Sequence, residues 1–156
     1  MRRKLNIKRE LRADINYNSI KLGKFTNYLM ESGKKNVARK IVADCMTAIK
    51  EKAKVENPLE LFETALKNTT PLMEVRSRRV GGANYQVPRE VRPERKQALS
   101  MKWLIDAARS KKGAPIHLKL ADEIISASKN EGEAVKKREN VHKMAEANKA
   151  FAHFAW

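Results

Sequence analysis

Apolar residues recur at helical spacing through most of the chain after Ser19. Between Ile20 and Leu29 they lie three and four positions apart, which predicts a first helix that the Ser32-Gly33 pair closes. A second helix is expected from there to about residue 54. The chain before this point, residues 1–18, mixes cations with isolated apolar residues and shows no period, which predicts a flexible basic arm.

Helix-starting and helix-breaking residues set the bounds of four further helices. Asn57 can cap a helix and Pro58 is tolerated at its first position, while Pro71 disfavours helix in the residue before it, so the third helix should stop at Thr70. Pro93 opens a fourth helix in the same way. The last three helices are expected from residue 93 to about 110, from 116 to 127, and from 133 towards 151.

The segment between the third and fourth helices has no helical stripe. It carries β-branched and aromatic residues on both sides of Gly81-Gly82, a pair that can supply the positive φ of a two-residue hairpin turn. This predicts three cross-strand pairs, namely Val80 with Ala83, Arg78 with Tyr85, and Arg76 with Val87. The fold class is therefore expected to be mainly α, a bundle of about six helices with a protruding two-stranded antiparallel β-ribbon at about 72–88. Residues 19–156 are expected to form one helical domain.

Charge narrows the class of function. The chain has 34 Lys and Arg against 18 Asp and Glu, a formal net charge of +16 that favours a polyanionic partner, most simply nucleic acid. No apolar run approaches the roughly 20 residues of a spanning helix, so no membrane partner is expected. The single Cys45 cannot form an internal disulfide and lies in a stripe with Val37, Ile41 and Ile49, which indicates a buried thiol in a reducing cytoplasm.

Positive charge is most concentrated in the ribbon and at the start of the fourth helix. Seven cations there are opposed only by Glu90 and Glu94: Arg76, Arg78, Arg79, Arg89, Arg92, Arg95 and Lys96. Arginine predominates, and its planar fork can bind phosphate through two N–H groups or stack on a base. With Tyr85 interleaved, RNA contact is favoured over a merely solvated face. Trp103 is expected to pack beside the core instead.

The sequence contains no motif that favours an enzyme or a metal site. The chain has three histidines, His117, His142 and His153, but no two of them lie four positions apart as in a helical zinc site. It also has no second Cys that could complete a set of zinc ligands. Gly81-Gly82 lacks the glycine spacing and the following Lys-Ser/Thr of a phosphate loop. No catalytic residue and no cofactor is predicted.

Three segments resemble the small-subunit ribosomal protein S7 family, bacterial type. They are residues 76–88 (RSRRVGGANYQVP) with Trp103-Leu104 and Ala107-Ala108-Arg109, residues 136–153 (KKRENVHKMAEANKAFAH) with Trp156, and Gly33-Lys34-Lys35. The resemblance runs from about Tyr17 to the end of the chain.

The resemblance implies a structural constituent of the small ribosomal subunit in the cytoplasm or an organelle. Such a protein would bind the 3′ major domain of the small-subunit rRNA, nucleate assembly of the subunit head, and lie near the messenger exit path, the exit-site tRNA, and neighbouring proteins of the head and platform. Together with the charge pattern, it predicts that these residues contact RNA: Arg2, Arg3, Lys4, Lys8, Arg9, Lys34, Lys35, Arg76, Arg78, Arg79, Tyr85, Arg89, Arg92, Arg95, Lys96, Arg109, Lys111, Lys112, Lys136, Lys137 and Arg138.

Two other classes fit parts of the pattern. In a nucleoid-type DNA-binding protein the sixth helix, with its three successive cations from residue 136, would enter a major groove. An rRNA-modifying enzyme would need a cofactor motif such as a glycine-rich loop after a strand, and the sequence has none.

Overall fold

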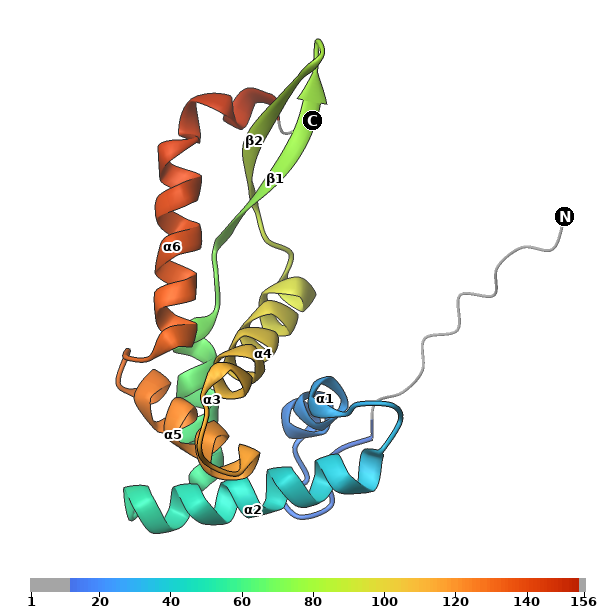
Figure 1. The fold of residues 1–156 in the computed structure, drawn as a ribbon, viewed down its shortest axis with the longest axis vertical. Coiled ribbons are helices and arrows are strands. Elements are labelled where there is room, and N and C mark those ends of the chain that lie inside the picture. The colour runs from blue at the N-terminus through green and yellow to red at the C-terminus, as the bar shows by residue number, and fades with distance from the viewer. Residues whose placement is uncertain (1–11, 155–156) are drawn as a thin grey trace, which may run out of the picture. The chain divides into compact units, whose positions relative to one another are not determined.

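The computed structural model describes residues 12–154. They form six α-helices, two antiparallel strands and a short 3-10 helix (Figure 1). The elements follow in the order α1 (Ile20–Leu29), α2 (Lys35–Ala53), α3 (Pro58–Thr69), β1 (Met73–Val80), β2 (Ala83–Glu90), α4 (Pro93–Ser110), α5 (Ile116–Ser128), α6 (Glu133–Ala147) and η1 (Lys149–Phe154). This confirms the predicted fold class.

The chain divides into two compact units, Met1–Ala43 and Asp44–Trp156, with the boundary inside α2. The predicted arm and single helical domain stay a prediction, and the arm before residue 12 lies outside the described residues. Within residues 12–154, no helix is both long enough and apolar enough to cross a membrane.

In the first unit, α1 begins where Ser19 caps it, its Oγ accepting the N–H of Leu22. The preceding residues turn back over this helix, and the backbone N–H of Asp14 donates to the Ser19 carbonyl. Gly23 permits this close approach, because a Cβ there would lie 2.5 Å from the carbonyl oxygen of Arg12. The apolar side chains of α1 are buried, with Leu22 and Phe25 each only 1% exposed.

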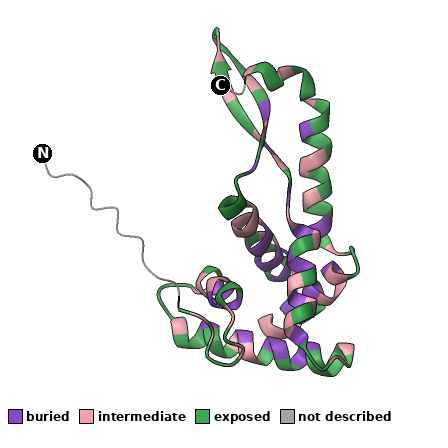
Figure 2. Ribbon diagram, turned by 180° about the vertical axis from the view of Figure 1, so that it is seen from behind, coloured by how far each residue is buried: buried purple, intermediate pink, exposed green. Residues whose placement is uncertain are grey.

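The core of the second unit lies where α3, α4 and α5 meet, and Figure 2 shows the buried residues gathered there. Phe62, Leu104 and Leu120, one from each helix, are fully buried. Two buried hydroxyls are also paired, Thr69 Oγ1 lying 2.6 Å from Ser100 Oγ. The apolar stripes predicted for these helices therefore face one another, and their burial supplies most of the stability of this unit.

Side chains of neighbouring helices form hydrogen bonds with backbone groups at one another's ends in this unit. Asn68 Nδ2 of α3 donates to the last carbonyls of α5, Arg138 of α6 donates to the Asn68 carbonyl, and Glu123 of α5 accepts the N–H of Ala134 at the start of α6. Backbone groups at helix ends have no partner within the helix, so these side chains fix the helices relative to one another.

The ribbon has the predicted turn and register. Gly81 and Gly82 have φ values of +57° and +89°, and Val80, Arg78 and Arg76 pair with Ala83, Tyr85 and Val87. Helix α6 lies alongside β1, and η1 contacts β2 (Figure 1). The predicted sixth helix is shorter than expected, because α6 ends at Ala147 and the chain continues as η1, where Phe151 and Phe154 contact Tyr85.

Cys45 is buried as predicted, with 2% of its surface exposed. Burial raises the pKa of its thiol to about 12, with a smaller contribution from the charge of Asp122, so the group is neutral at physiological pH. The predicted stripe is only partly right, because Ile49 is fully buried but Val37 is 55% exposed.

Candidate nucleic-acid interface

Three arginines converge on one carboxylate at the base of the ribbon. Glu74 of β1 lies directly across from Arg89 of β2, Arg76 follows two residues later on the same face, and Arg95 comes from the first turn of α4. The Nε atoms of Arg95, Arg76 and Arg89 lie 2.6, 3.0 and 3.6 Å from the Glu74 oxygens. These four residues are called the Glu74 cluster below.

Glu74 is ionised at neutral pH although its side chain is only 8% exposed. Burial alone would raise the pKa of this carboxyl group, but the hydrogen bonds and charges of Arg95 and Arg76 outweigh that effect and hold the pKa below its ordinary value. Three guanidinium groups around one carboxylate leave the Glu74 cluster with an excess of positive charge. Such an excess suits a phosphate group.

The outer part of the same ribbon face is covered by the end of the chain. Arg78 Nη1 donates to the Phe154 carbonyl at 2.8 Å, and the ring of Tyr85 lies 5.2 and 5.3 Å from the rings of Phe151 and Phe154. Arg78 and Tyr85, both predicted to contact RNA, therefore also hold η1 on the ribbon.

Other predicted cations project from the ribbon and the nearby helices. Arg79 on β1 and Arg92, which precedes α4, are exposed and have no side-chain partner among residues 12–154. Lys112 and Lys137 share that property, and Arg109 is exposed in the last turn of α4. Of these residues, Arg79, Arg92, Lys112 and Lys137 can bind an anion without first breaking an ion pair with a described residue.

Four further predicted cations have partners within the second unit. Lys96 and Lys136 form ion pairs with Glu90 at 3.6 Å and with Glu133 at 2.9 Å. Lys111 lies 2.5 Å from the fully buried Glu123, and Arg138 donates a hydrogen bond to the Asn68 carbonyl. Glu123 Oε2 makes no hydrogen bond of good geometry, so its contact with Lys111 is an ion pair. Lys111 and Arg138 thus serve the fold of the second unit.

The remaining predicted residues belong to the first unit. Lys34 is exposed and Lys35 half-buried at the start of α2, whose first turn contains no acidic residue. The predicted arm residues Arg2, Arg3, Lys4, Lys8 and Arg9 lie outside the described residues.

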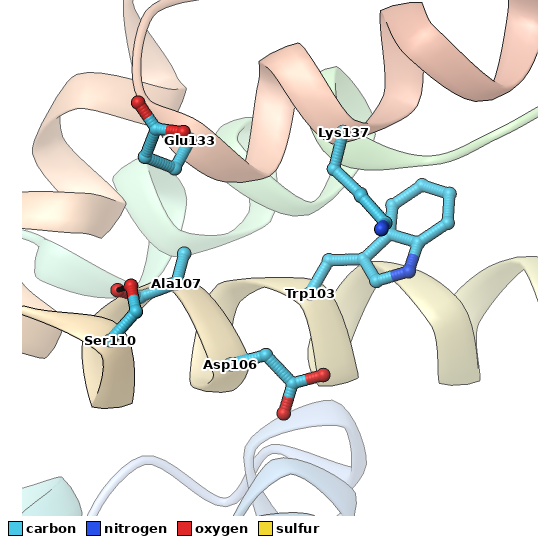
Figure 3. A pocket seen from close by; sticks show the side chains of 6 residues that line it. All are labelled: Trp103, Asp106, Ala107, Ser110, Glu133 and Lys137. Atoms are coloured by element: carbon cyan, nitrogen blue, oxygen red, sulfur yellow. Dashed lines mark hydrogen bonds between the residues drawn. The ribbon is translucent and has the colours of Figure 1, made fainter.

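A shallow cavity of about 240 Å³ lies between α4 and α6 (Figure 3). Trp103, Asp106, Ala107 and Ser110 of α4 line it, together with Lys137 and Glu133 of α6, and Lys137 extends towards Trp103. Trp103 is half-buried, so its ring is not confined to the core. Within residues 12–154 no group of His, Cys, Asp and Glu side chains could hold a metal ion.

Sequence reasoning missed Glu74 as part of the interface. It counted only Glu90 and Glu94 against the arginines, because it considered charge from Arg76 onward. The alternation of a strand could have revealed Glu74, since residues 74, 76 and 78 share one face. The contribution of Arg95 could not be found this way, because it depends on how the chain turns from β2 into α4 and brings the Arg95 side chain back to Glu74.

The chain matches the family model described as Ribosomal protein S7p/S5e over residues 1–149. It is 53% identical over 153 residues to the Small ribosomal subunit protein uS7 of Marinomonas sp. (strain MWYL1), covering 98% of each chain. It is 55% identical over 153 residues to the protein of that name from Pseudomonas aeruginosa (strain LESB58), covering 98% of this chain and 97% of the other.

A third relative of the same name, from Francisella tularensis subsp. holarctica (strain OSU18), is 55% identical over 149 residues, which are 96% of this chain and 95% of the relative. Matches of this length span the ribbon and all the helices of this chain. The chain therefore belongs to the ribosomal protein S7 family, and to its bacterial type.

Proposed function

We propose that this chain is an RNA-binding structural constituent of the small ribosomal subunit. Family membership supports the place in the subunit, because the relatives carry the name Small ribosomal subunit protein uS7. The family is one of structural ribosomal components and not of enzymes. The Glu74 cluster carries the RNA-binding part of the proposal, since it presents three guanidinium groups at the base of an otherwise basic ribbon.

The proposed ligand is the 3′ major domain of the small-subunit rRNA. Binding early in assembly would organise the subunit head and leave the protein near the messenger exit path and the exit-site tRNA, beside other proteins of the head and platform. The resemblance of residues 76–88 and 136–153 to this family supports these finer assignments. The formal net charge of +16 supports the choice of a polyanionic ligand such as RNA.

Binding is proposed to use charge and shape together. Lys34 and Lys35 at the start of α2 would neutralise phosphates, as would the cations before residue 12. Arg79 and Arg92 can bind phosphates through two N–H groups or stack on unpaired bases. Because bases are hidden inside RNA helices, specificity would come from the shape of a junction between helices.

Insertion of α6 into a DNA major groove is less well supported. Of its three successive cations, Lys136 is paired with Glu133 and Arg138 donates to the Asn68 carbonyl. Only Lys137 is exposed without a partner among the described residues, and α6 also lies against β1. A recognition helix needs several unengaged side chains on one exposed face.

A competition experiment tests the proposal. The full-length protein is bound to a labelled 3′ major domain of small-subunit rRNA, and unlabelled duplex DNA or unlabelled rRNA domain is added. Specific binding predicts that duplex DNA competes at least about a hundredfold less well than the RNA domain. Equal competition by duplex DNA would contradict the proposal and favour the nucleoid-type reading.

The same assay can locate the interface with two double variants of equal charge. Arg79→Gln with Arg92→Gln removes two exposed cations from the proposed interface, and Lys67→Gln with Lys143→Gln removes two exposed cations elsewhere in the second unit. The arginine pair should weaken RNA binding by about tenfold or more, and the lysine pair by about twofold. Similar losses in both variants would mean that charge alone, and not the ribbon, governs binding.

A further inference from the structure

We propose that Glu74 is a positioning residue that holds three arginines in a preformed cradle for the phosphates of an RNA backbone. The inference rests on the proposed function and assigns a role to an acidic residue inside a basic interface. It concerns the Glu74 cluster, in which each arginine is held through its Nε atom.

The three arginines contact Glu74 through Nε, which leaves their other N–H groups available to a ligand. A guanidinium group has one Nε–H and four further N–H groups on its η nitrogens. In Arg76, Arg89 and Arg95 it is Nε that lies against Glu74, and no hydrogen bond within residues 12–154 uses the η nitrogens of these three residues. Their side chains remain 36–49% exposed, so these N–H groups can reach a ligand in solvent.

The base of the cradle is fixed by the fold. Val87 and Val91 are buried on either side of Arg89, and the Val91 N–H donates to the Leu72 carbonyl, which extends the pairing of the two strands below the ribbon. Arg95 lies in the first turn of α4, where the positive end of the helix dipole adds to the attraction for an anion. Side chains from the ribbon and from α4 thus converge on Glu74.

A phosphate diester group is the ligand that matches these features. It is anionic and offers oxygens to paired N–H groups, and arginine binds it with defined geometry. Without Glu74, three long side chains would each have to be ordered when RNA binds, which weakens binding. With Glu74, that ordering is already present in the unbound protein.

Removal of one negative charge distinguishes this idea from simple electrostatics. Glu74→Gln keeps the shape of the side chain but removes its charge, and Glu90→Gln removes the same charge from an 81% exposed position on the other strand of the ribbon. If only net charge mattered, both variants would bind RNA as tightly as the parent or more tightly. Positioning predicts instead that Glu74→Gln binds the labelled 3′ major domain about tenfold more weakly, while Glu90→Gln binds with unchanged or up to about twofold higher affinity.

The salt dependence should separate loss of order from loss of contacts. The arginines remain present in Glu74→Gln, so its log–log slope of affinity against salt should match that of the parent. Suppose that the parent prefers rRNA to duplex DNA but Glu74→Gln binds the RNA domain as tightly as Glu90→Gln, or more tightly. That result would overturn the inference and leave the proposed function intact. Lack of that preference in the parent would count against the proposed function itself.

The order of the arginines can also be tested in the unbound parent protein. This test needs neither RNA nor a correctly folded variant for its decisive result. The inference predicts that the Nε–Hε groups of Arg76 and Arg95 give protected, slowly exchanging NMR signals in the parent, like those of a well-ordered hydrogen bond. In Glu74→Gln these signals should be lost while the backbone signals of α4 persist. Rapidly exchanging Nε–Hε signals in the parent would show that Glu74 does not order the arginines, and would overturn the inference.

Discussion

At the scale of single residues, Gly132 shows how tightly one helix end is built. It precedes α6 with φ +97°, and a Cβ there would lie 2.8 Å from Oε1 of Glu123, the atom that accepts the N–H of Ala134. Glu123 is fully buried and also paired with Lys111. An added methyl group would therefore displace a buried charge from its partners.

Gly132→Ala is expected to lower the free energy of unfolding by about 3 kcal/mol or more, combining backbone strain with loss of the cap. Gly113→Ala is the matched control, because Gly113 has φ +90° but nothing within 4 Å of the added Cβ. It should cost only about 1–2 kcal/mol of strain. Urea unfolding measures both, and equal losses would mean that the Glu123 contact contributes little.

His142 links α6 to the start of the ribbon, since its Nε2 accepts the Leu72 N–H at 3.0 Å. Burial, and to a lesser extent the charge of Arg138, hold the pKa of His142 below its ordinary value of 6.5. The unfolded chain therefore takes up a proton more readily than the folded chain. Stability from this contact is present above pH 6.5 and is lost as the pH falls through the folded pKa.

Thermal unfolding should show this dependence. Between about pH 7.5 and pH 5 the Tm of the parent should fall more than that of His142→Gln, which cannot titrate. The ring signals of His142 in NMR should titrate below pH 6.5. Parallel Tm curves for the two proteins would argue that His142 does not couple stability to pH.

At the scale of elements, η1 determines how much of the ribbon is open to a ligand. Its aromatic rings cover Tyr85, and the Phe154 carbonyl accepts from Arg78. A two-stranded hairpin is marginal by itself in water, so contact with η1 and α6 stabilises the paired strands within this chain.

Phe151→Ala with Phe154→Ala should loosen the outer ribbon and leave the core of α3, α4 and α5 intact. Two tilted aromatic pairs are worth about 0.5–1.5 kcal/mol each. Amide hydrogen exchange near Tyr85 should become roughly tenfold faster, with unchanged exchange in α5. Lys149→Ala, an exposed change in the same element, serves as the control. Unchanged exchange near Tyr85 in the double variant would show that η1 does not hold the ribbon.

At the scale of the whole molecule, a net charge of +16 implies that several phosphates are neutralised when RNA binds, and their number sets the salt dependence of the affinity. Each neutralised phosphate releases condensed counterions and contributes a log–log slope of about −0.7 to −0.9. Four or more such contacts predict a slope of about −3 or steeper, so a fourfold rise in salt should weaken binding by roughly fiftyfold. Filter binding at a series of KCl concentrations measures it, and a nearly flat response would refute the electrostatic part of the mechanism.

The local features of this chain were predictable from sequence because their causes are local. Ser19 and Asn57 cap helices within three residues of themselves, and Gly81-Gly82 sets both the turn and the register of the ribbon. The charge pattern and the resemblance to the S7 family likewise need no structure. The RNA contacts predicted for individual cations stay predictions.

Only the tertiary structure decided which of those cations are already engaged. Arg95 meets Glu74 across 21 positions of the chain, and Arg78 meets Phe154 across 76. The η1 segment that follows α6 likewise contacts Tyr85, more than 60 positions earlier in the chain. Such pairings leave no period in the sequence, because they arise where packed helices bring distant segments together and buried polar groups must find partners there.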